Sequence, residues 1–111
     1  MYNIKIIRCA LSDSVRDSSP PASTVDQLFF RKGIRVDYLK ADVEGAEARL
    51  LCGARKTIAS CRPRIAITTY HDENNWQEML GIVKDVCPSY RYKIKGIYHV
   101  NKKPVMMHMW V

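Results

Sequence analysis

The chain has 111 residues, a length that suits one domain built around one hydrophobic core. Hydrophobic residues make up 47% and charged residues 26%, which is ordinary globular usage and excludes a chain that is disordered throughout. The formal net charge is +7, but the Lys and Arg residues are dispersed without a run of five like charges, so the composition allows an anionic substrate and does not favour a nucleic-acid partner.

The N-terminal part of the chain predicts a strand, a loop and a helix. Residues 4–11 (IKIIRCAL) are rich in strand-forming side chains and predict a strand. Residues 12–23 contain five serines and a Pro-Pro pair, a composition typical of an exposed loop. Ser23 or Thr24 can cap a helix that follows, and Gly33 is placed to end it.

The central part alternates between strands and helices. Residues 34–41 (IRVDYLKA) alternate as a strand does, and the pattern becomes helical from Gly45. Gly53 interrupts this helix, and residues 54–60 predict a second, short one. Residues 64–69 (RIAITT) form a short apolar run that is typical of a buried parallel strand.

The C-terminal part predicts one long helix and a hairpin. Residues 72–86 place an apolar stripe at helical spacing, and Pro88 forbids continuation. Residues 90–98 and 105–111 predict two strands joined by a turn at 101–104, which their short connection makes antiparallel. The whole order predicts a single α/β domain over residues 1–111, with a mainly parallel sheet, helices on both faces and a C-terminal antiparallel hairpin.

Residues 42–47 (DVEGAE) lie between a predicted strand and a predicted helix. Ligands of open α/β sheets bind beyond the carboxyl ends of the strands, so Asp42 and Glu44 are expected at such a rim. Gly45 permits a tight strand-to-helix turn, and Glu47 in the first turn favours the helix dipole. On spacing alone, the alternative that these acids only cap the helix is equally open.

Residues 36–58 (VDYLKADVEGAEARLLCGARKTI) resemble the signature of FkbM-type S-adenosylmethionine-dependent methyltransferases. Three further matches follow the family's order: Ala10 to Asp13, Thr24 to Leu28, and the strand that ends near His71. The resemblance implies a partial Rossmann-like class I methyltransferase fold. It also implies methyl transfer from S-adenosylmethionine, usually to a hydroxyl oxygen, on a small-molecule or glycan acceptor.

The resemblance also implies roles for individual residues. Asp42, Glu44 and His71 would be catalytic, and His71 could accept the proton of the acceptor because an imidazole can act as a base near neutral pH. The alternative for His71 is a rim histidine that only makes local hydrogen bonds. Leu11, Ser12 and Asp13, together with Asp42, would contact the cofactor.

The chain departs from the family pattern in two ways. Thr69 stands where family members usually carry a Glu, two residues before the histidine. The glycine-rich cofactor loop is missing, since it would precede Met1, so we expect a truncated domain that holds the acceptor half of the site. We therefore expect residues 4–9 to pair with the strand at 36–41, or two chains to form a homodimer through this sheet edge.

Two other functions are weighed against the methyltransferase. One is a non-catalytic α/β module for protein association. The other is a basic module in which the hairpin residues Arg91, Lys93, Lys95, Tyr90 and Tyr92 bind an anion or a nucleic acid, although such alternation more often marks one core face and one wet face.

Cysteine and histidine spacing predicts no metal site. The four cysteines form no C-x-x-C pair, and His71, His99 and His108 are far apart in the sequence. The cysteines are therefore expected to be free thiols. With no signal sequence and no apolar run of the roughly 20 residues that a membrane helix needs, we expect a cytoplasmic protein without membrane contact.

Overall fold

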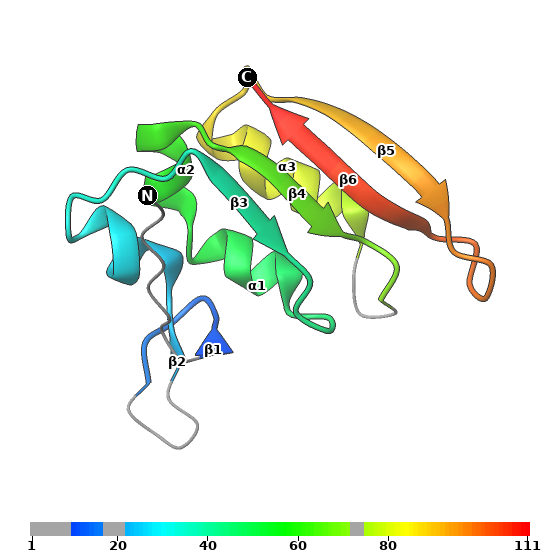
Figure 1. Cartoon of the computed structure of the whole chain (residues 1–111), viewed down its shortest axis with the longest axis horizontal. Coiled ribbons are helices and arrows are strands. Elements are labelled where there is room, and N and C mark those ends of the chain that lie inside the picture. The colour runs from blue at the N-terminus through cyan, green and yellow to red at the C-terminus, as the bar shows by residue number, and fades with distance from the viewer. Residues whose placement is uncertain (1–9, 17–21, 72–74) are drawn as a thin grey trace, which may run out of the picture.

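The computed structural model of the chain describes residues 10–16, 22–71 and 75–111. A four-stranded sheet lies at its centre, in the order β3-β4-β6-β5 (Figure 1). The strands are β3 (Tyr38–Ala41), β4 (Arg64–Thr68), β5 (Arg91–Ile97) and β6 (Pro104–Trp110), and the helices are α1 (Glu47–Cys52), α2 (Arg55–Cys61) and α3 (Trp76–Val86).

Three strands of this sheet run in one direction and one runs against them. β3 pairs with β4 in parallel, and β6 is antiparallel to both β4 and β5. The predicted α/β class and C-terminal hairpin are therefore confirmed. The reversed strand does not end the sheet, however, because β6 is inserted between β4 and β5.

The expected helices on both faces are not found in the described segments, whose helices α1 to α3 lie on one face. The reason is the handedness of the crossovers. The connection from β3 to β4 and the connection from β4 to β5 both advance across the sheet in the same direction. Right-handed crossovers that advance the same way place their helices on the same face.

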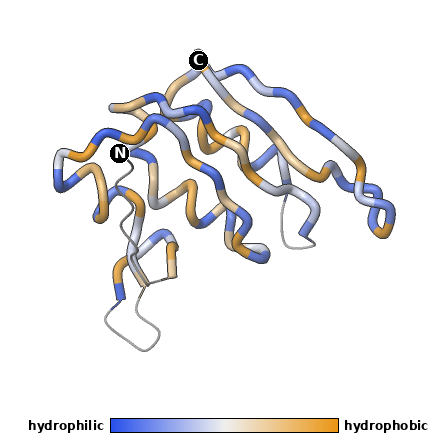
Figure 2. The backbone as a smooth tube through the Cα atoms, viewed as in Figure 1, coloured by the Kyte–Doolittle hydropathy of each residue, from blue (hydrophilic) through white to orange (hydrophobic). Residues whose placement is uncertain are grey.

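The hydrophobic core lies between this face of the sheet and the helices. Ile65 and Ile67 of β4 stand opposite Met109 and Met107 of β6, and all four side chains are buried. Each of the three helices contributes buried apolar side chains, among them Leu50, Leu51, Ile58, Met79 and Val83. Figure 2 shows the contrast between apolar β4 and the edge strand β5, where hydrophilic residues dominate. Every residue of β5 is exposed except Ile94, which is half-buried and packs against the core.

The N-terminal segment differs from the exposed loop expected over residues 12–23. Ala10–Leu11 (β1) and Ala22–Ser23 (β2) pair in parallel, and Ser12, Ala22 and Ser23 are buried. Residues 13–16 are exposed, as expected. Of the strand predicted at 4–11, only residues 10 and 11 are described. The expected pairing of residues 4–9 with β3 lies outside the described residues, and within them β4 is the only strand that pairs with β3.

A short π-helical segment, η1 (Asp26–Phe30), connects this region to the helices. The Thr24 hydroxyl oxygen accepts a hydrogen bond from the Gln27 backbone N–H at 3.0 Å, so the predicted cap is confirmed. The Asp26 carboxylate reaches across to α2, which has no cap of its own. It accepts hydrogen bonds from the backbone N–H groups of Lys56 at 3.0 Å and Thr57 at 2.8 Å. Asp26 thus caps α2 from a distant part of the sequence.

Two predicted elements begin later than the sequence indicated. The strand expected at 34–41 starts at Tyr38, and the helix expected at 72–86 starts at Trp76, where Asn75 accepts hydrogen bonds from the N–H groups of Gln77 and Glu78. In the described ranges, every helix is too short or too polar to cross a membrane.

Candidate active site

The turn after β3 brings the first site residues to the carboxyl end of the sheet. Asp42 directly follows β3, and its side chain is 51% exposed. Glu44 and Gly45 have positive φ angles of 54° and 99°, which reverse the chain into α1. A positive φ is uncommon for a residue with a Cβ and recurs at functional sites, whereas Gly45 adopts it without strain.

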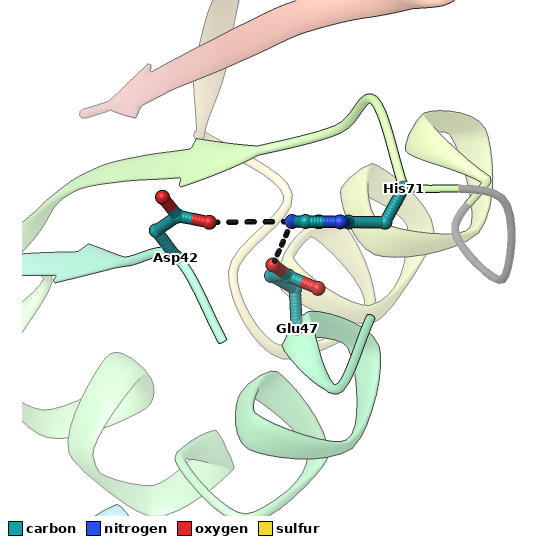
Figure 3. Close-up of side chains that lie close together, drawn as sticks. All are labelled: Asp42, Glu47 and His71. Atoms are coloured by element: carbon teal, nitrogen blue, oxygen red, sulfur yellow. Dashed lines mark hydrogen bonds and ion pairs between the residues drawn. The ribbon is translucent and has the colours of Figure 1, made fainter. Parts of the chain in front are cut away.

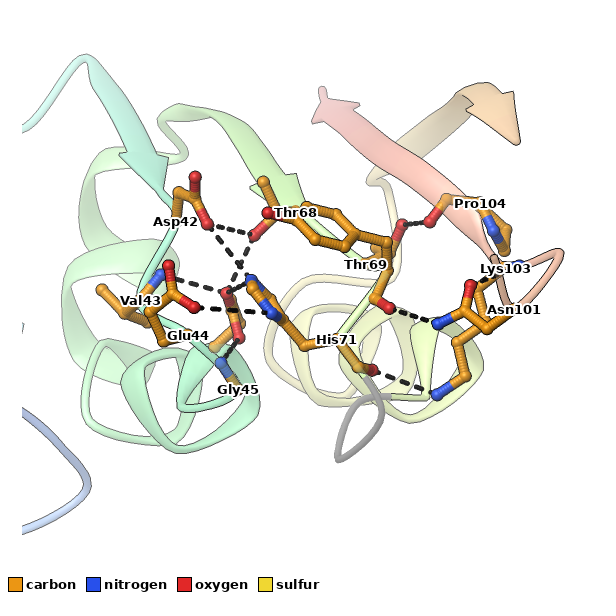
Figure 4. A network of polar contacts seen from close by, with 12 residues as sticks. Asp42, Val43, Glu44, Gly45, Thr68, Thr69, His71, Asn101, Lys103 and Pro104 are labelled. Carbon is orange, nitrogen blue, oxygen red and sulfur yellow. Dashed lines mark hydrogen bonds and ion pairs between the residues drawn. The ribbon is translucent and has the colours of Figure 1, made fainter. Parts of the chain in front are cut away.

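Glu47, the first residue of α1, is buried with 0% exposure. Its carboxylate accepts three hydrogen bonds in the network of Figure 4: from the N–H of Val43 at 3.0 Å, the N–H of Gly45 at 3.0 Å and the hydroxyl of Thr68 at 2.8 Å. Hydrogen bonds of this kind are what makes burial of a carboxylate tolerable. Glu47 therefore organises the turn from within, and does not only favour the helix dipole as the sequence suggested.

His71 completes the cluster from the loop after β4. Its Nε2 atom lies 3.2 Å from Oδ1 of Asp42 and 3.5 Å from Oε1 of Glu47, and its side chain is 11% exposed (Figure 3). The parallel pairing of β3 with β4 puts the two carboxyl ends side by side. Residues that are 29 positions apart in the sequence thereby come into contact.

Three polar contacts hold the segment that carries His71 against the β5–β6 hairpin (Figure 4). The Thr69 hydroxyl donates to the carbonyl of Pro104, the Asn101 amide donates to the carbonyl of Tyr70 at 2.7 Å, and Lys103 Nζ donates to the carbonyl of His71 at 3.1 Å. Thr69, which replaces the glutamate of the family pattern, is thus a structural tie to the hairpin.

Tyr70 packs beside the imidazole. Its ring centroid lies 4.2 Å from that of His71 and 4.9 Å from that of Tyr98. Desolvation raises the pKa of Tyr70, and the negative charges of Asp42 and Glu44 raise it further. The hydroxyl therefore stays protonated at neutral pH and offers a hydrogen-bond donor next to the site.

The orientation of His71 suits a general base. With Nε2–H directed at the carboxylates of Asp42 and Glu47, the other ring nitrogen, Nδ1, carries the lone pair. Nδ1 lies 4.0 Å from Oε2 of Glu44, whose side chain is 86% exposed at the rim. A carboxylate that holds one nitrogen of an imidazole fixes its tautomer and leaves the other nitrogen to accept a proton.

Two cavities of about 330 and 320 Å³ are lined by residues close to this cluster in the sequence, the first by Thr69 and the second by Glu44. Trp76, Asn75 and Gln77 line the first together with Lys103, whose ammonium holds the His71 carbonyl. Glu44 and Arg49 are among the residues that line the second. The first combines an aromatic face with amide groups, and its size is at the lower end of the range for ligand pockets.

The residues predicted to contact the cofactor lie near the two ends of α1. The Ser12 carbonyl packs against Gly53, just beyond the C-terminal end of α1, whereas Asp42 and Glu47 lie at its N-terminal end. The six residues of α1 separate the two groups by about 9 Å. Asp13 lines a different cavity of about 260 Å³, and the Ser12 hydroxyl donates to the Asp13 carboxylate at 3.0 Å. The cofactor contacts expected of Leu11, Ser12, Asp13 and Asp42 stay a prediction, in which Asp13 and Asp42 would contact different parts of one cofactor.

The hairpin does not present the aromatic and basic surface considered above. Tyr90 is buried and donates its hydroxyl hydrogen to the carbonyl of Pro63 at 2.6 Å. Tyr92 contacts Trp76 on the helix side of the sheet, with ring centroids 5.8 Å apart. Arg91, Lys93 and Lys95 are exposed on the opposite face without these tyrosines.

Sequence reasoning missed Glu47 and Thr68 as site residues and did not anticipate a group of side chains that could hold a metal ion. It considered only spacing among histidines and cysteines, but the fold gathers one histidine with two carboxylates, Asp42 and Glu47, whose ligand atoms all lie within 4.8 Å of one another. Glu47 is visible in the sequence as the second glutamate of DVEGAE. Its burial beside Thr68 could not be predicted from the sequence.

Comparison with known proteins identifies the family and a similar fold. The model of the methyltransferase FkbM domain family matches residues 7–94. The crystal structure of the methyltransferase FkbM from Methylobacillus flagellatus KT resembles the chain with a TM-score of 0.77 at 18% sequence identity. That likeness covers 92% of this chain and 27% of the other, so the chain spans about a quarter of that protein's length. The curated proteins include no match.

Proposed function

The chain belongs to the methyltransferase FkbM domain family, and we propose that it supplies the acceptor side of an O-methyl transfer site. The observation that carries the proposal is the contact of His71 Nε2 with Asp42 Oδ1 at 3.2 Å. In this role, Asp42 and Glu47 orient the imidazole, and Nδ1 of His71 accepts the proton of an acceptor hydroxyl. Glu44 lies beside Nδ1 at the rim, where it can accept a hydrogen bond from a second hydroxyl of the acceptor.

A sugar or another small polyhydroxyl compound is the acceptor class that we propose. The cavity of about 330 Å³ that Thr69 helps to line supports it, because Trp76 offers an aromatic face and Asn75 and Gln77 offer amide groups for hydroxyls. The protonated hydroxyl of Tyr70 adds a donor next to the imidazole.

The methyl donor proposed from the family is S-adenosylmethionine, which would supply a methyl group on a sulfonium. Ser12 and Asp13 lie near the C-terminal end of α1 and Asp42 near its N-terminal end, so they would contact different parts of this donor. The roles argued from the described residues are to orient the acceptor and to accept its proton.

We place the protein in the cytoplasm. Cys52, Cys61 and Cys87 are free thiols, and Cys61 accepts a hydrogen bond from the N–H of Val36 at 3.4 Å. Unpaired cysteines of this kind suit a reducing compartment.

The test combines calorimetry with a transfer assay. The chain is titrated with S-adenosylmethionine and then incubated with the labelled donor and a panel of mono- and oligosaccharides. We expect label in a sugar acceptor, and a loss of about 100-fold or more in His71→Gln, since general bases contribute roughly 10²–10⁴-fold. His108→Gln, on the other side of the sheet, is the matched control. No heat at millimolar donor and no label would instead favour the non-catalytic association module.

A further inference from the structure

The cluster of Asp42, Glu47 and His71 points to a site for a divalent metal ion. We propose that the chain binds one divalent transition-metal cation through Oδ1 of Asp42, Oε1 of Glu47 and Nε2 of His71. These three atoms come from the turn after β3, the start of α1 and the loop after β4, and they converge on one point (Figure 3). Binding of the ion goes beyond the proposed methyl transfer and does not depend on it.

The spacing of the three atoms fits a coordination sphere. Metal–ligand bonds of about 2.1 Å place neighbouring ligand atoms about 3.0 Å apart in an octahedral site and about 3.4 Å apart in a tetrahedral one. The distance from His71 Nε2 is 3.2 Å to Oδ1 of Asp42 and 3.5 Å to Oε1 of Glu47. These two separations match a coordination sphere, and all three ligand atoms lie within 4.8 Å of one another.

Charge favours the same conclusion. Asp42 and Glu47 both face Nε2 of the same imidazole, which carries at most one positive charge. A divalent cation matches the two carboxylates together. Glu47 is 0% exposed, so the attraction between its carboxylate and a bound cation would be screened less than an attraction between charges at the surface.

The surroundings hold these ligands in position. Gly45 N–H holds the other carboxylate oxygen of Glu47, and the Thr68 hydroxyl contacts both Glu47 Oε1 at 2.8 Å and Asp42 Oδ1 at 3.2 Å. Glu44 lies 4.0 Å from Nδ1 of His71, the nitrogen that a metal-bound imidazole directs at an outer carboxylate. The site thus has three ligands and an outer shell that orients them.

The ligand chemistry selects the ion. One imidazole nitrogen suits Zn²⁺ and other transition metals, whereas Mg²⁺ and Ca²⁺ prefer oxygen alone. Two carboxylates still allow Mn²⁺, and the order of affinity predicts tighter binding of Zn²⁺ than of Mn²⁺. Three protein ligands leave a position for water or for a hydroxyl of a bound molecule, whose pKa the ion would lower. His71 would then be a ligand instead of a base.

Binding of Mn²⁺ to the full 111-residue chain, freed of metal by chelation, tests the proposal by electron paramagnetic resonance. Mn²⁺ is the probe because it does not favour the free thiols. We expect one bound ion, which Zn²⁺ displaces, and affinity at least 10-fold weaker in Asp42→Asn and in His71→Gln. Asp37→Asn, an equivalent change at an exposed aspartate paired with Arg35, is expected to leave the affinity unchanged.

A measurement on the unaltered chain makes the test independent of how the variants fold. Bound Mn²⁺ should broaden the nuclear magnetic resonance signals of the His71 ring before those of Tyr90, which lies against Pro63 just before the start of β4. Absence of Mn²⁺ and Zn²⁺ binding at millimolar metal would overturn the proposal. So would binding that persists unchanged in folded Asp42→Asn and His71→Gln. Methyl transfer that resists chelators would leave the base role of His71 intact, so the two proposals can fail separately.

Discussion

Thr68, the last residue of β4, donates its hydroxyl hydrogen to Oε1 of Glu47, the first residue of α1, at 2.8 Å. The same carboxylate oxygen lies 3.5 Å from His71. One buried side chain therefore links the end of a strand, the start of a helix and the candidate catalytic histidine. The stability of the turn and the geometry of the site depend on the same atoms.

Glu47→Gln should destabilise the fold. The amide keeps the size of the side chain but has only one acceptor oxygen, so a hydrogen bond from Val43, Gly45 or Thr68 is lost. Since hydrogen bonds to a charged group are worth about 1.5–3 kcal/mol, we expect the free energy of unfolding in urea to fall by about 2 kcal/mol. Glu78→Gln, at an exposed position of α3, is the control and should change it by less than about 0.5 kcal/mol. Equal effects of the two changes would contradict the role of Glu47.

Asp26→Ala should loosen the contact between η1 and α2. The change removes a cap that accepts hydrogen bonds from two backbone N–H groups and from the Thr57 hydroxyl. Loss of a cap costs about 0.5–2 kcal/mol, and we expect the upper end of that range in urea denaturation. Asp85→Ala, in the last turn of α3, removes a charge that the helix dipole disfavours and should not destabilise the protein.

Gly53→Ala should destabilise the N-terminal segment. An added Cβ would meet the Ser12 carbonyl oxygen and, at 3.1 Å, the side chain of Thr24. Overpacking of this kind costs about 1–3 kcal/mol, visible as a lower thermal midpoint. Gly81→Ala provides a sensitive control, because Gly81 lies within α3 and nothing lies within 4 Å of the added atom. There the change should stabilise the protein by about 0.5–1 kcal/mol.

Tyr90→Phe should alter stability in a pH-dependent way. Burial raises the pKa of Tyr90 above its ordinary value of 10.0, so the folded chain holds this proton more tightly than the unfolded chain. The corresponding stability is present below pH 10.0 and is lost as the pH rises further. We expect Phe to reduce the alkaline loss and, by leaving the Pro63 carbonyl unpaired, to cost about 1–3 kcal/mol at pH 7. Tyr92 is 44% exposed, and Tyr92→Phe is the control that should show neither effect.

We propose that two copies of the chain form a homodimer through the edge of β3 that faces away from β4. Within the described residues β3 pairs with β4 alone, and an unpaired edge is a template for another strand. Amide exchange at residues 38–41 should then slow as protein concentration rises, in step with the mass measured by light scattering. Protection at every concentration in a monomer would instead support pairing with residues 4–9.

The local elements were predictable because their signals are local. The apolar stripe of α3, the Gly53 break between α1 and α2, and the hairpin of β5 and β6 follow from residues close together in the sequence. Strand order is a different kind of property. The insertion of β6 between β4 and β5 reflects pairing across the whole chain, and it decides that the described helices share one face.

The same distinction holds for the candidate site. Residues 36–58 and three further matches indicated the family, and the motif at residues 42–47 indicated the carboxyl rim of the sheet, because these patterns lie in short stretches of consecutive residues. Only the tertiary structure decided that Glu47 is buried, that His71 contacts both Glu47 and Asp42, and that Ser12 and Asp13 lie beyond the far end of α1. The physical reason is that burial and ligand geometry depend on which strand ends lie side by side, and that arrangement is settled by packing of the core.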